Sequence, residues 1–327
     1  MKRRLNMNTI LKVEGLKKYY DIRGGLLQRV VGHVKAVDGI SFEIKSGSTF
    51  GLVGESGCGK TTVGRTLLRL HSNNGGKVIF DGKDMFALSN KELRAIRPEL
   101  QIIFQDPYSS LSPKMPVGEI IGEAVREHKL VPEKELRNYV MQIMRECGLQ
   151  DHHIDRYPHE FSGGQRQRIC IARAVALKPK VIICDEPVSA LDVSVQAQII
   201  NLLMDLQKER GLSYVFISHD LSVVEHISDE VGVMYLGNLV EKAPKKEIFK
   251  NPMHPYTKSL FSAIPTPDPT VKMNRIVLEG DIPSPANPPA GCKFHTRCRD
   301  CMEICKTVAP EYKCHDNDHY VACHKYE

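Results

Sequence analysis

Short apolar runs alternate with helical stretches over about the first 245 residues of the chain. Thr49–Val53 predicts a buried strand, which a glycine-rich loop joins to a helix expected over Lys60–Leu70. Two more buried strands are expected in the segments KVIICDE and LSYVFISHD. This alternation of strands and helices is typical of an α/β domain.

A helical insert is expected between about residues 106 and 160. The segment EKELRNYVMQIMRECG places its apolar residues on one helical face. These residues are Leu136, Tyr139, Val140, Ile143, Met144 and Cys147. Pro132 precedes this helix, and Gly148 stands where a helix C-cap belongs.

The composition changes after Ala243. The segments NPMHPYTKSLFSAIPTPDPT and GDIPSPANPPAGC are rich in proline, which indicates a boundary followed by a loop-rich extension. We therefore expect one domain over residues 1–245 and an extension over residues 246–327. The end of this extension holds six of the ten cysteines: Cys292, Cys298, Cys301, Cys305, Cys314 and Cys323.

Composition narrows the class of protein. The chain has 327 residues, of which 42% are hydrophobic and 26% are charged, as in ordinary soluble globular proteins. A net charge of +6 is modest and does not favour nucleic acid as a partner. No run approaches the ~18 apolar residues of a membrane helix, and no signal-peptide core follows the basic start. These features predict a cytosolic protein, in which clustered cysteines indicate metal or redox chemistry rather than disulfides.

A phosphate-binding loop is predicted at Gly54–Thr61, where GESGCGKT matches G-x-x-x-x-G-K-T between a strand and a helix. Its glycines let backbone N–H groups curl around phosphate oxygens. Lys60 supplies positive charge to the β- and γ-phosphates, and the Thr61 hydroxyl can bind Mg²⁺. Cys58, inside the loop, is interpreted as a small filler rather than as a redox switch.

Two carboxylates end the predicted strand VIICDE. Asp185 is the candidate ligand of Mg²⁺, since strand ends facing a phosphate loop hold that ion. Glu186 points differently along the strand and can orient or deprotonate an attacking water. An acid pair alone is weak evidence because strand ends often carry solvated acids. Together with the phosphate loop, it indicates nucleotide hydrolysis.

Three further polar motifs occur in the same chain. FSGGQRQR places Ser162, Gly163 and Gly164 directly before a predicted helix, which gives a second anion site at a helix N-terminus. FQDPYSSLSP places Gln105 after an apolar strand, within reach of a metal ion or water. VFISHD sets His219 at a strand end, where it can donate to a γ-phosphate.

The order of these motifs resembles that of an ABC-transporter ATP-binding subunit, from about residue 10 to residue 245. The resemblance implies a P-loop NTPase of the α/β class, with a RecA-like core, an antiparallel β subdomain, a helical subdomain and a small cysteine-rich extension. It also implies hydrolysis of ATP with Mg²⁺.

The resemblance further implies individual roles. Glu186 would be the general base, with His219 and Gln105 as the other catalytic residues, and Thr61, Gln105 and Asp185 would hold Mg²⁺. Tyr20 would stack on adenine, with Tyr19 as a near-equivalent choice. The full set of implied ATP-binding residues is Tyr20, Gly54, Glu55, Ser56, Gly57, Cys58, Gly59, Lys60, Thr61, Thr62, Gln105, Ser162, Gly163, Gly164, Gln165, Asp185 and Asp192.

The extension indicates which group of ABC-transporter ATP-binding subunits the chain resembles. NPMHPYTKSLFSAIP, a proline loop and GC-x5-C resemble the C-terminal region of dipeptide and oligopeptide importer ATPases, a group that includes nickel and glutathione importers. GGQRQRI is similar to the F-type subunit. The implied partners are a related D-type ATP-binding subunit in a heterodimer, two transmembrane permease subunits and an extracytoplasmic peptide-binding protein. The chain would then lie peripherally on the cytoplasmic face of the inner membrane. A soluble ABC ATPase and a metal-responsive regulator are the alternatives.

The cysteine tail has three interpretations, one of which is a tail without metal. Cys298-x2-Cys301 by itself suggests zinc, and nearby histidines (His295, His315, His319 and His324) would allow a mixed zinc site. The family resemblance instead implies a [4Fe–4S] cluster held by Cys292, Cys298, Cys305 and Cys323, which leaves Cys301 and Cys314 as extra thiols. With zinc or with the cluster, we expect a structural role in a segment with little core of its own, separate from the ATP chemistry.

Overall fold

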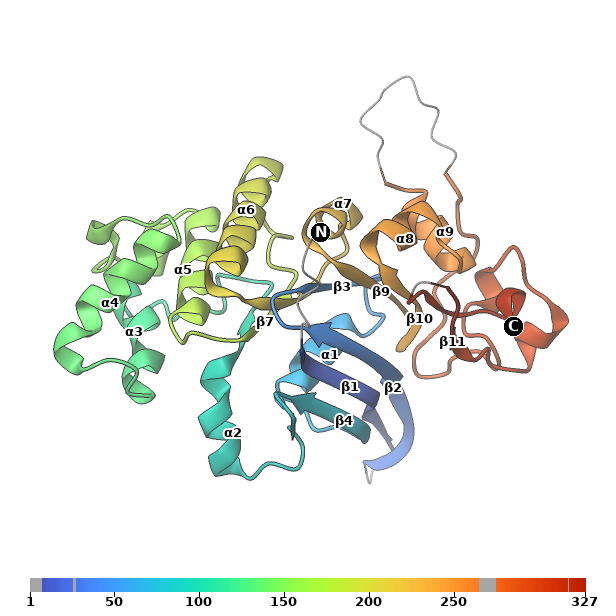
Figure 1. Ribbon diagram of the computed structural model, residues 1–327. Helices are drawn as coiled ribbons and strands as arrows, with labels where there is room; N and C mark the ends of the chain where they lie inside the picture. The colour runs from blue at the N-terminus through green and yellow to red at the C-terminus, as the bar shows by residue number, and fades with distance from the viewer. Residues whose placement is uncertain (1–7, 26–27, 265–274, 317) are drawn as a thin grey trace, which may run out of the picture. The chain divides into compact units, whose positions relative to one another are not determined.

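The computed structural model describes residues 8–25, 28–264, 275–316 and 318–327. Its residues form two compact units, and Figure 1 labels helices and strands of both. The first unit contains Ile44–Ser48, Ala87–Ile217 and the described residues before Leu11. The second unit contains the described parts of Leu11–Glu43, Thr49–Phe86 and Ser218–Glu327.

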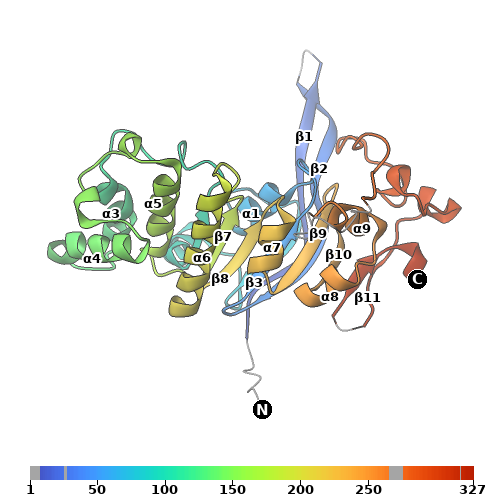
Figure 2. The ribbon, with the colours of Figure 1, turned by 90° about the horizontal axis from the view of Figure 1, so that it is seen from above.

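A four-stranded sheet with the order β2-β1-β4-β5 lies in the second unit. Its strands are β1 (Thr9–Gly24), β2 (Arg29–Lys45), β4 (Gly75–Phe80) and β5 (Lys83–Asp84). β1 pairs antiparallel with β4, and Figure 2 shows β1 and β2 side by side as two long strands. Leu11, Val13 and Leu16 of β1 are fully buried, so one face of this sheet packs into a core. This sheet is the antiparallel part that the resemblance implies.

The second unit holds another run of strands in the order β11-β12-β10-β9-β3. These strands are β3 (Thr49–Val53), β9 (Glu230–Tyr235), β10 (Asn238–Pro244), β11 (Tyr312–Cys314) and β12 (Tyr320–Ala322). β3 and β9 are parallel, whereas β10 pairs antiparallel with both β9 and β12. The cysteine-rich tail therefore extends the sheet whose strand β3 leads into the glycine loop.

Four α-helices accompany these strands. They are α1 (Lys60–Leu67), α7 (Leu221–Ile227), α8 (Lys245–Lys250) and α9 (Pro255–Phe261). The expected end of the first helix at Leu70 is wrong, because α1 ends at Leu67. Arg69 adopts a left-handed φ of 52°, which a continuing right-handed helix does not allow, and its N–H donates to Thr66 O.

Three parallel strands in the order β8-β7-β6 form the sheet of the first unit: β6 (Leu100–Ile103), β7 (Val181–Asp185) and β8 (Ser213–Ile217). Every residue of β7 and β8 is buried, as expected for parallel strands. The α-helices beside them are α2 (Asn90–Ile96), α5 (Gly163–Val175) and α6 (Val193–Arg210). The strands predicted in KVIICDE and LSYVFISHD are thus confirmed, although they end at Asp185 and Ile217.

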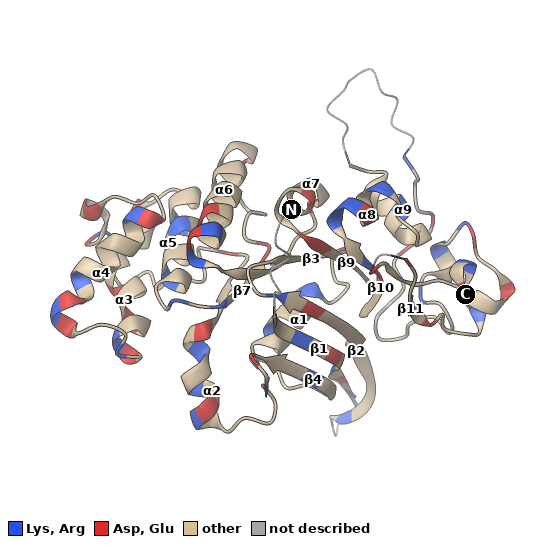
Figure 3. Ribbon diagram, viewed as in Figure 1, with Lys and Arg blue, Asp and Glu red and all other residues tan. Residues whose placement is uncertain are grey.

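The helical insert contains α3 (Val117–Glu127), α4 (Glu133–Glu146) and the short 3₁₀ helices Asp151–His153 and Pro158–Glu160. The face predicted for α4 is confirmed: Leu136, Val140, Ile143 and Met144 are buried. Gly148 follows with a left-handed φ of 73°. Charges of both signs alternate along α4 (Figure 3), and Arg137 and Arg145 each form an exposed ion pair with a nearby aspartate.

The C-terminal extension has more core than expected. Phe294 and Tyr256, from the extension, pack with Tyr235 of β9, with ring centroids 4.8–5.3 Å apart. All three rings are at most 1% exposed. This aromatic cluster and the pairing of β12 with β10 attach the extension to the second unit. Among the described residues, no helix is both long and apolar enough to span a membrane.

Candidate nucleotide-binding site

The glycine loop after β3 has the shape that its sequence predicts. Gly54 and Gly59 have φ values of 153° and 108°. A Cβ atom would lie 2.2 Å from Met234 O at Gly54 and 2.0 Å from Ala36 O at Gly59. At Gly57 it would meet nothing within 4 Å, although the φ of 78° still favours glycine. Gly54 and Gly59 are therefore required because a side chain at either position would clash with a backbone oxygen. All three glycines are favoured because their φ values are positive.

Lys60 is tied into this loop. It is the first residue of α1 and only 5% exposed. Its ammonium group donates to Gly54 O at 2.8 Å and to Glu55 O at 3.0 Å. A buried positive charge thus lies against the loop at the N-terminal end of a helix, an arrangement that favours a phosphate group.

Cys58 is buried in this loop, and its interpretation as a small filler stays a prediction. The side chain is 5% exposed, and burial raises the pKa of its thiol. A thiol that stays protonated is a poor nucleophile. A redox switch at this position is therefore disfavoured.

The two tyrosines considered for adenine stacking differ in their surroundings. The Tyr19 hydroxyl donates to Asp38 Oδ1 at 2.5 Å, and burial together with this bond raises the pKa of Tyr19 to about 12. Tyr20 is 37% exposed, with its ring edge-to-face with His71 at 5.9 Å. The exposed ring of Tyr20 fits the stacking role better than the anchored Tyr19, and that role stays a prediction.

His219 follows β8 and directly precedes the N-cap of α7. The N-cap is Asp220, whose side chain accepts from the N–H groups of Ser222 and Val223. His219 itself is exposed. The cap fixes the backbone on one side of the histidine, and the γ-phosphate role stays a prediction.

Gln105 and Glu186 meet in the first unit. The Gln105 side-chain amide donates to Glu186 Oε2 at 2.9 Å, although 81 residues separate them. Glu186 has a left-handed φ of 49°, and its N–H donates to Ile217 O of β8. This conformation is uncommon for a residue other than glycine and is concentrated at functional sites. Asp185, the last residue of β7, is 1% exposed. The proposed base is therefore held by both its backbone and its side chain.

The SGGQ segment begins α5 as predicted. Ser162 is the N-cap: its hydroxyl accepts from Gln165 N at 3.3 Å, and Gln165 Oε1 accepts from Ser162 N at 3.1 Å. This reciprocal capping box fixes the first turn. A Cβ atom at Gly164 would lie 2.5 Å from Val195 Cγ1 of α6, so the glycine allows the two helices to approach closely.

Asp192 is the N-cap of α6. Its carboxylate accepts from Ser194 Oγ at 2.7 Å and from Val195 N at 3.0 Å. These bonds lower the pKa of Asp192. The Asp192 side chain therefore caps the N-terminus of α6. The nucleotide role that the resemblance implies for it stays a prediction.

The tail cysteines lie near enough to affect one another electrostatically. Burial, together with the thiols of Cys305, Cys323 and Cys301, raises the pKa of Cys292 to about 11. Burial also raises the pKa of Cys298 to about 12, with added effects of Cys292 and Cys323. Cys314 is exposed. Within the described ranges, no three His, Cys, Asp or Glu side chains form a group that could hold a metal ion. Neither a mixed zinc site nor a four-cysteine cluster thus gains support from the described residues.

Two residues of the extension contact the phosphate loop, which the sequence analysis did not anticipate. Arg297 and Tyr256 both bond to Glu55, the second residue of the loop. The extension therefore reaches the phosphate loop, and the expectation that the tail takes no part in the ATP chemistry stays a prediction. The arginine directly before Cys298 was the available signal, but 242 residues separate it from Glu55.

Acid is expected to weaken the attachment of the extension through His254. Burial lowers the pKa of this histidine to about 4, with Glu241 opposing the shift and Lys258 adding to it. The unfolded chain, with a pKa near ~6.5, takes up the proton first. The free energy of unfolding should therefore fall between about pH 6.5 and pH 4, by at most about 3 kcal/mol.

Urea unfolding at pH 7.5 and pH 5 measures this effect. Asparagine can keep the bond that the His254 side chain accepts from Tyr256 N. His254→Asn should therefore reduce the pH dependence, whatever its effect on absolute stability. An equal pH dependence in the wild type and the variant would show that other groups cause it.

Two known families match the sequence. Residues 37–189 match the ABC transporter family, and residues 240–305 match the oligopeptide/dipeptide transporter C-terminal region. The chain is 54% identical over 324 residues to the oligopeptide transport ATP-binding protein AppF of Bacillus subtilis, covering 98% of each protein. It is 50% identical over 306 residues to the dipeptide transport ATP-binding protein DppF of Escherichia coli, covering 93% of this chain and 91% of that protein.

Solved structures agree with this match. The dimeric ATP-binding cassette MJ0796, in a post-hydrolysis state with ADP and Pi, has a TM-score of 0.64 at 25% identity and covers 72% of this chain and 98% of its own. The structure of cbiO1 from Clostridium perfringens, part of the ABC transporter complex cbiONQ, has a TM-score of 0.63 at 30% identity. That match covers 74% of this chain and 91% of cbiO1.

Proposed function

The chain belongs to the ATP-binding subunits of ABC transporters, in the oligopeptide and dipeptide branch, and from this premise we propose that its ATP hydrolysis drives peptide import. The observation that carries the hydrolytic part is the contact of Gln105 with Glu186 beside the buried Asp185. The peptide cargo is supported by relatives that match this chain over nearly its whole length, including the extension.

Some of these residues bind the nucleotide, and others act in its hydrolysis. Lys60 and the loop N–H groups bind the phosphates, and Glu186 takes a proton from the attacking water. Gln105 holds the Glu186 carboxylate in place at 2.9 Å. When bound, Mg²⁺ neutralises charge on the β- and γ-phosphate oxygens. Thr61, Gln105 and Asp185 are the residues that we propose for it, and the buried carboxylate of Asp185 suits a hard cation.

Partner subunits follow from this role. The sequence has one phosphate loop and one SGGQ segment, and we propose that a related D-type subunit supplies the second of each in a heterodimer. Two permease subunits would form the path through the membrane, and an extracytoplasmic protein would deliver the peptide. The chain would then bind peripherally at the cytoplasmic face of the inner membrane.

Peptide uptake in cells tests the proposed cargo. A strain without this chain should lose accumulation of labelled di- and oligopeptides, and the wild-type chain should restore it. If the deleted strain accumulates peptides normally but loses uptake of nickel or glutathione, the cargo is wrong while the ATPase assignment stands.

We further propose that Cys292, Cys298, Cys305 and Cys323 hold a structural [4Fe–4S] cluster. Electrostatic effects among Cys292, Cys305 and Cys323 are in keeping with a shared site, and Cys301 acts on Cys292 as well. A cluster of four irons is larger than a single ion, so its thiolates stand farther apart than the ligands of zinc. The described residues form no group of three metal ligands, so the proposal rests on the family resemblance.

Cluster loss is expected on replacing Cys305. Protein purified without oxygen should be brown and carry about four irons per chain. Cys305→Ser should remove the colour, because Cys305 is 7% exposed and its thiol acts on both Cys292 and Cys323. The exposed Cys314 offers a matched control, and Cys314→Ser should stay brown. Colourless protein with one zinc per chain would contradict the cluster.

A further inference from the structure

The carboxylate of Glu55 is held by the C-terminal extension. The Arg297 guanidinium donates to both carboxylate oxygens, at 2.7 Å and 3.0 Å. The side chains are 7% exposed at Arg297 and 24% exposed at Glu55, so little water competes for the pair. A two-point contact between guanidinium and carboxylate fixes orientation as well as position.

The backbone of the same loop residue is held by a second group of the extension. The Glu55 N–H donates to the Tyr256 hydroxyl at 2.8 Å. Tyr256 is 0% exposed and packs against Phe294 and Tyr235. The hydroxyl therefore cannot move away from Glu55 without disturbing a buried aromatic cluster.

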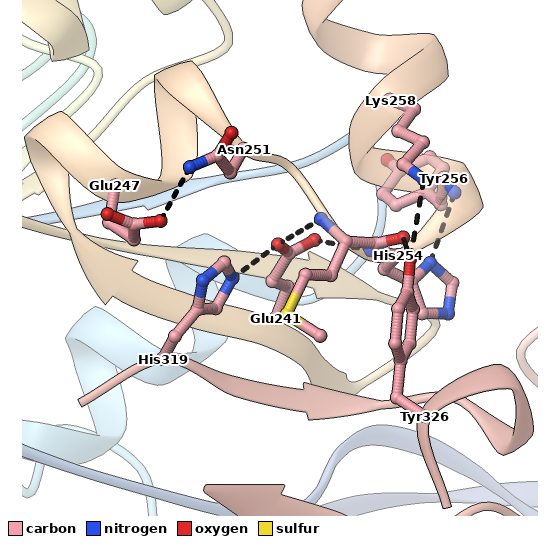
Figure 4. A network of polar contacts seen from close by, with 9 residues as sticks. Glu241, Glu247, Asn251, His254, Tyr256, Lys258, His319 and Tyr326 are labelled. Atoms are coloured by element: carbon pink, nitrogen blue, oxygen red, sulfur yellow. Dashed lines mark hydrogen bonds and ion pairs between the residues drawn. The ribbon is translucent and has the colours of Figure 1, made fainter. Parts of the chain in front are cut away.

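The position of Tyr256 depends in turn on the C-terminal tail. Figure 4 shows Glu241 of β10 between His319 and the start of α9. This fully buried carboxylate accepts from Met253 N at 2.7 Å and His254 N at 2.9 Å, and His319 Nε2 lies 2.7 Å from it. His254 Nδ1 then accepts from Tyr256 N at 3.1 Å.

A second tail contact supports the same segment. The hydroxyl of Tyr326, after Cys323, donates to Met253 O at 3.0 Å (Figure 4). The segment that carries Tyr256 is thus held by His319 and Tyr326, which lie on either side of Cys323 in the sequence. Arg297 lies directly before Cys298. One contact with Glu55 therefore comes from Arg297, which is next to Cys298. The other comes from Tyr256, whose segment is linked to residues on either side of Cys323.

Glu55 matters for the nucleotide because its carbonyl accepts from the Lys60 ammonium group at 3.0 Å. A displacement of Glu55 would remove one of the acceptors that place this charge. We propose that Arg297 and Tyr256 are positioning residues: through Glu55 they hold the phosphate loop in its binding shape, so that the affinity for ATP depends on the docked extension. The tail is then part of the nucleotide-binding machinery rather than a separate appendage.

Affinity of the full-length chain for a fluorescent ATP analogue with Mg²⁺ tests this proposal. Arg297→Gln removes the charge and should weaken binding about tenfold, the size expected for a lost charge-assisted contact. Arg299→Gln is the matched control, since Arg299 is 57% exposed and donates to Val277 O in the same extension. It should bind the analogue as the wild type does. Wild-type affinity in Arg297→Gln would overturn the proposal.

A double variant distinguishes positioning from general stability. If Arg297 acts through Glu55, its loss should have little further effect once Glu55→Gln has removed the carboxylate. An equally large loss of affinity in both backgrounds would show that Arg297 acts by another route, and the proposal would fail.

Tyr256→Phe keeps the buried ring and removes the hydroxyl alone. It therefore tests the contact between the Tyr256 hydroxyl and the Glu55 N–H, even if Arg297→Gln does not fold. We expect affinity to fall about fivefold while the thermal midpoint changes little. Unchanged affinity in Tyr256→Phe would contradict the proposed role of the hydroxyl.

Discussion

Replacing Glu186 with glutamine is expected to lower ATP hydrolysis by about 100-fold or more while leaving the affinity for ATP nearly unchanged. The variant loses a proton acceptor but keeps the size of the side chain and a hydrogen-bonding partner for Gln105. Since the proposed role of the lost group is to act on water and not on the bound nucleotide, an ATP-bound closed dimer should accumulate.

Single-turnover hydrolysis and nucleotide binding, measured on the same sample, separate these effects. Glu123→Gln, at an exposed position of α3, is a control of identical chemistry and should hydrolyse ATP at the wild-type rate. Weakened ATP affinity with normal turnover of bound nucleotide would mean that the role of Glu186 is misassigned.

Lys60→Ala is expected to abolish both ATP binding and hydrolysis. The substitution removes the buried charge that the loop offers to the phosphates, and it leaves Gly54 O and Glu55 O without this donor. Calorimetry with ATP and Mg²⁺ should show no detectable binding at concentrations that saturate the wild type.

Folding must be checked in parallel, because Lys60 is buried. A cooperative thermal transition in Lys60→Ala would show that the protein folds and that the loss is local. Lys83→Ala removes an exposed lysine from β5 of the same unit and should bind ATP normally. Wild-type turnover in Lys60→Ala would contradict the loop assignment.

Local sequence patterns predicted the elements that present the site. The glycine loop, the strand before it and the start of α1 follow from one contiguous motif, and the SGGQ segment begins α5 with the capping box its residues allow. Helix ends were less predictable. The left-handed Arg69 ends the first helix early, and nothing in its residue type requires that conformation.

The contacts between the extension and the phosphate loop could not be predicted in the same way. Arg297 and Glu55 are 242 residues apart, and no periodicity relates them. Strands β11 and β12 have three residues each, too few for an alternating pattern to indicate them. Their pairing with β10 and the aromatic cluster are tertiary effects, which is why a proline-rich, cysteine-rich tail was expected to have little core.

The choice of cysteine ligands also could not be made from the sequence pattern alone. Spacing alone favoured the Cys298-x2-Cys301 pair and zinc, whereas the family resemblance selected Cys305 and Cys323 in place of Cys301. The electrostatic effects on Cys292 do not separate the two sets, because Cys301 acts on it as well as Cys305 and Cys323. The choice of the second set therefore rests on the family resemblance, which joins positions up to 31 residues apart, from Cys292 to Cys323.

Peptide-dependent ATP hydrolysis by the reconstituted transporter tests the central claim most directly. The chain would be assembled with the proposed D-type partner and two permease subunits in lipid nanodiscs, with the proposed extracytoplasmic binding protein added. Hydrolysis should rise when the binding protein carries a di- or oligopeptide, and Glu186→Gln should abolish this rise. If peptide-loaded binding protein leaves hydrolysis unchanged in an assembly that is otherwise active, the chain does not power peptide import.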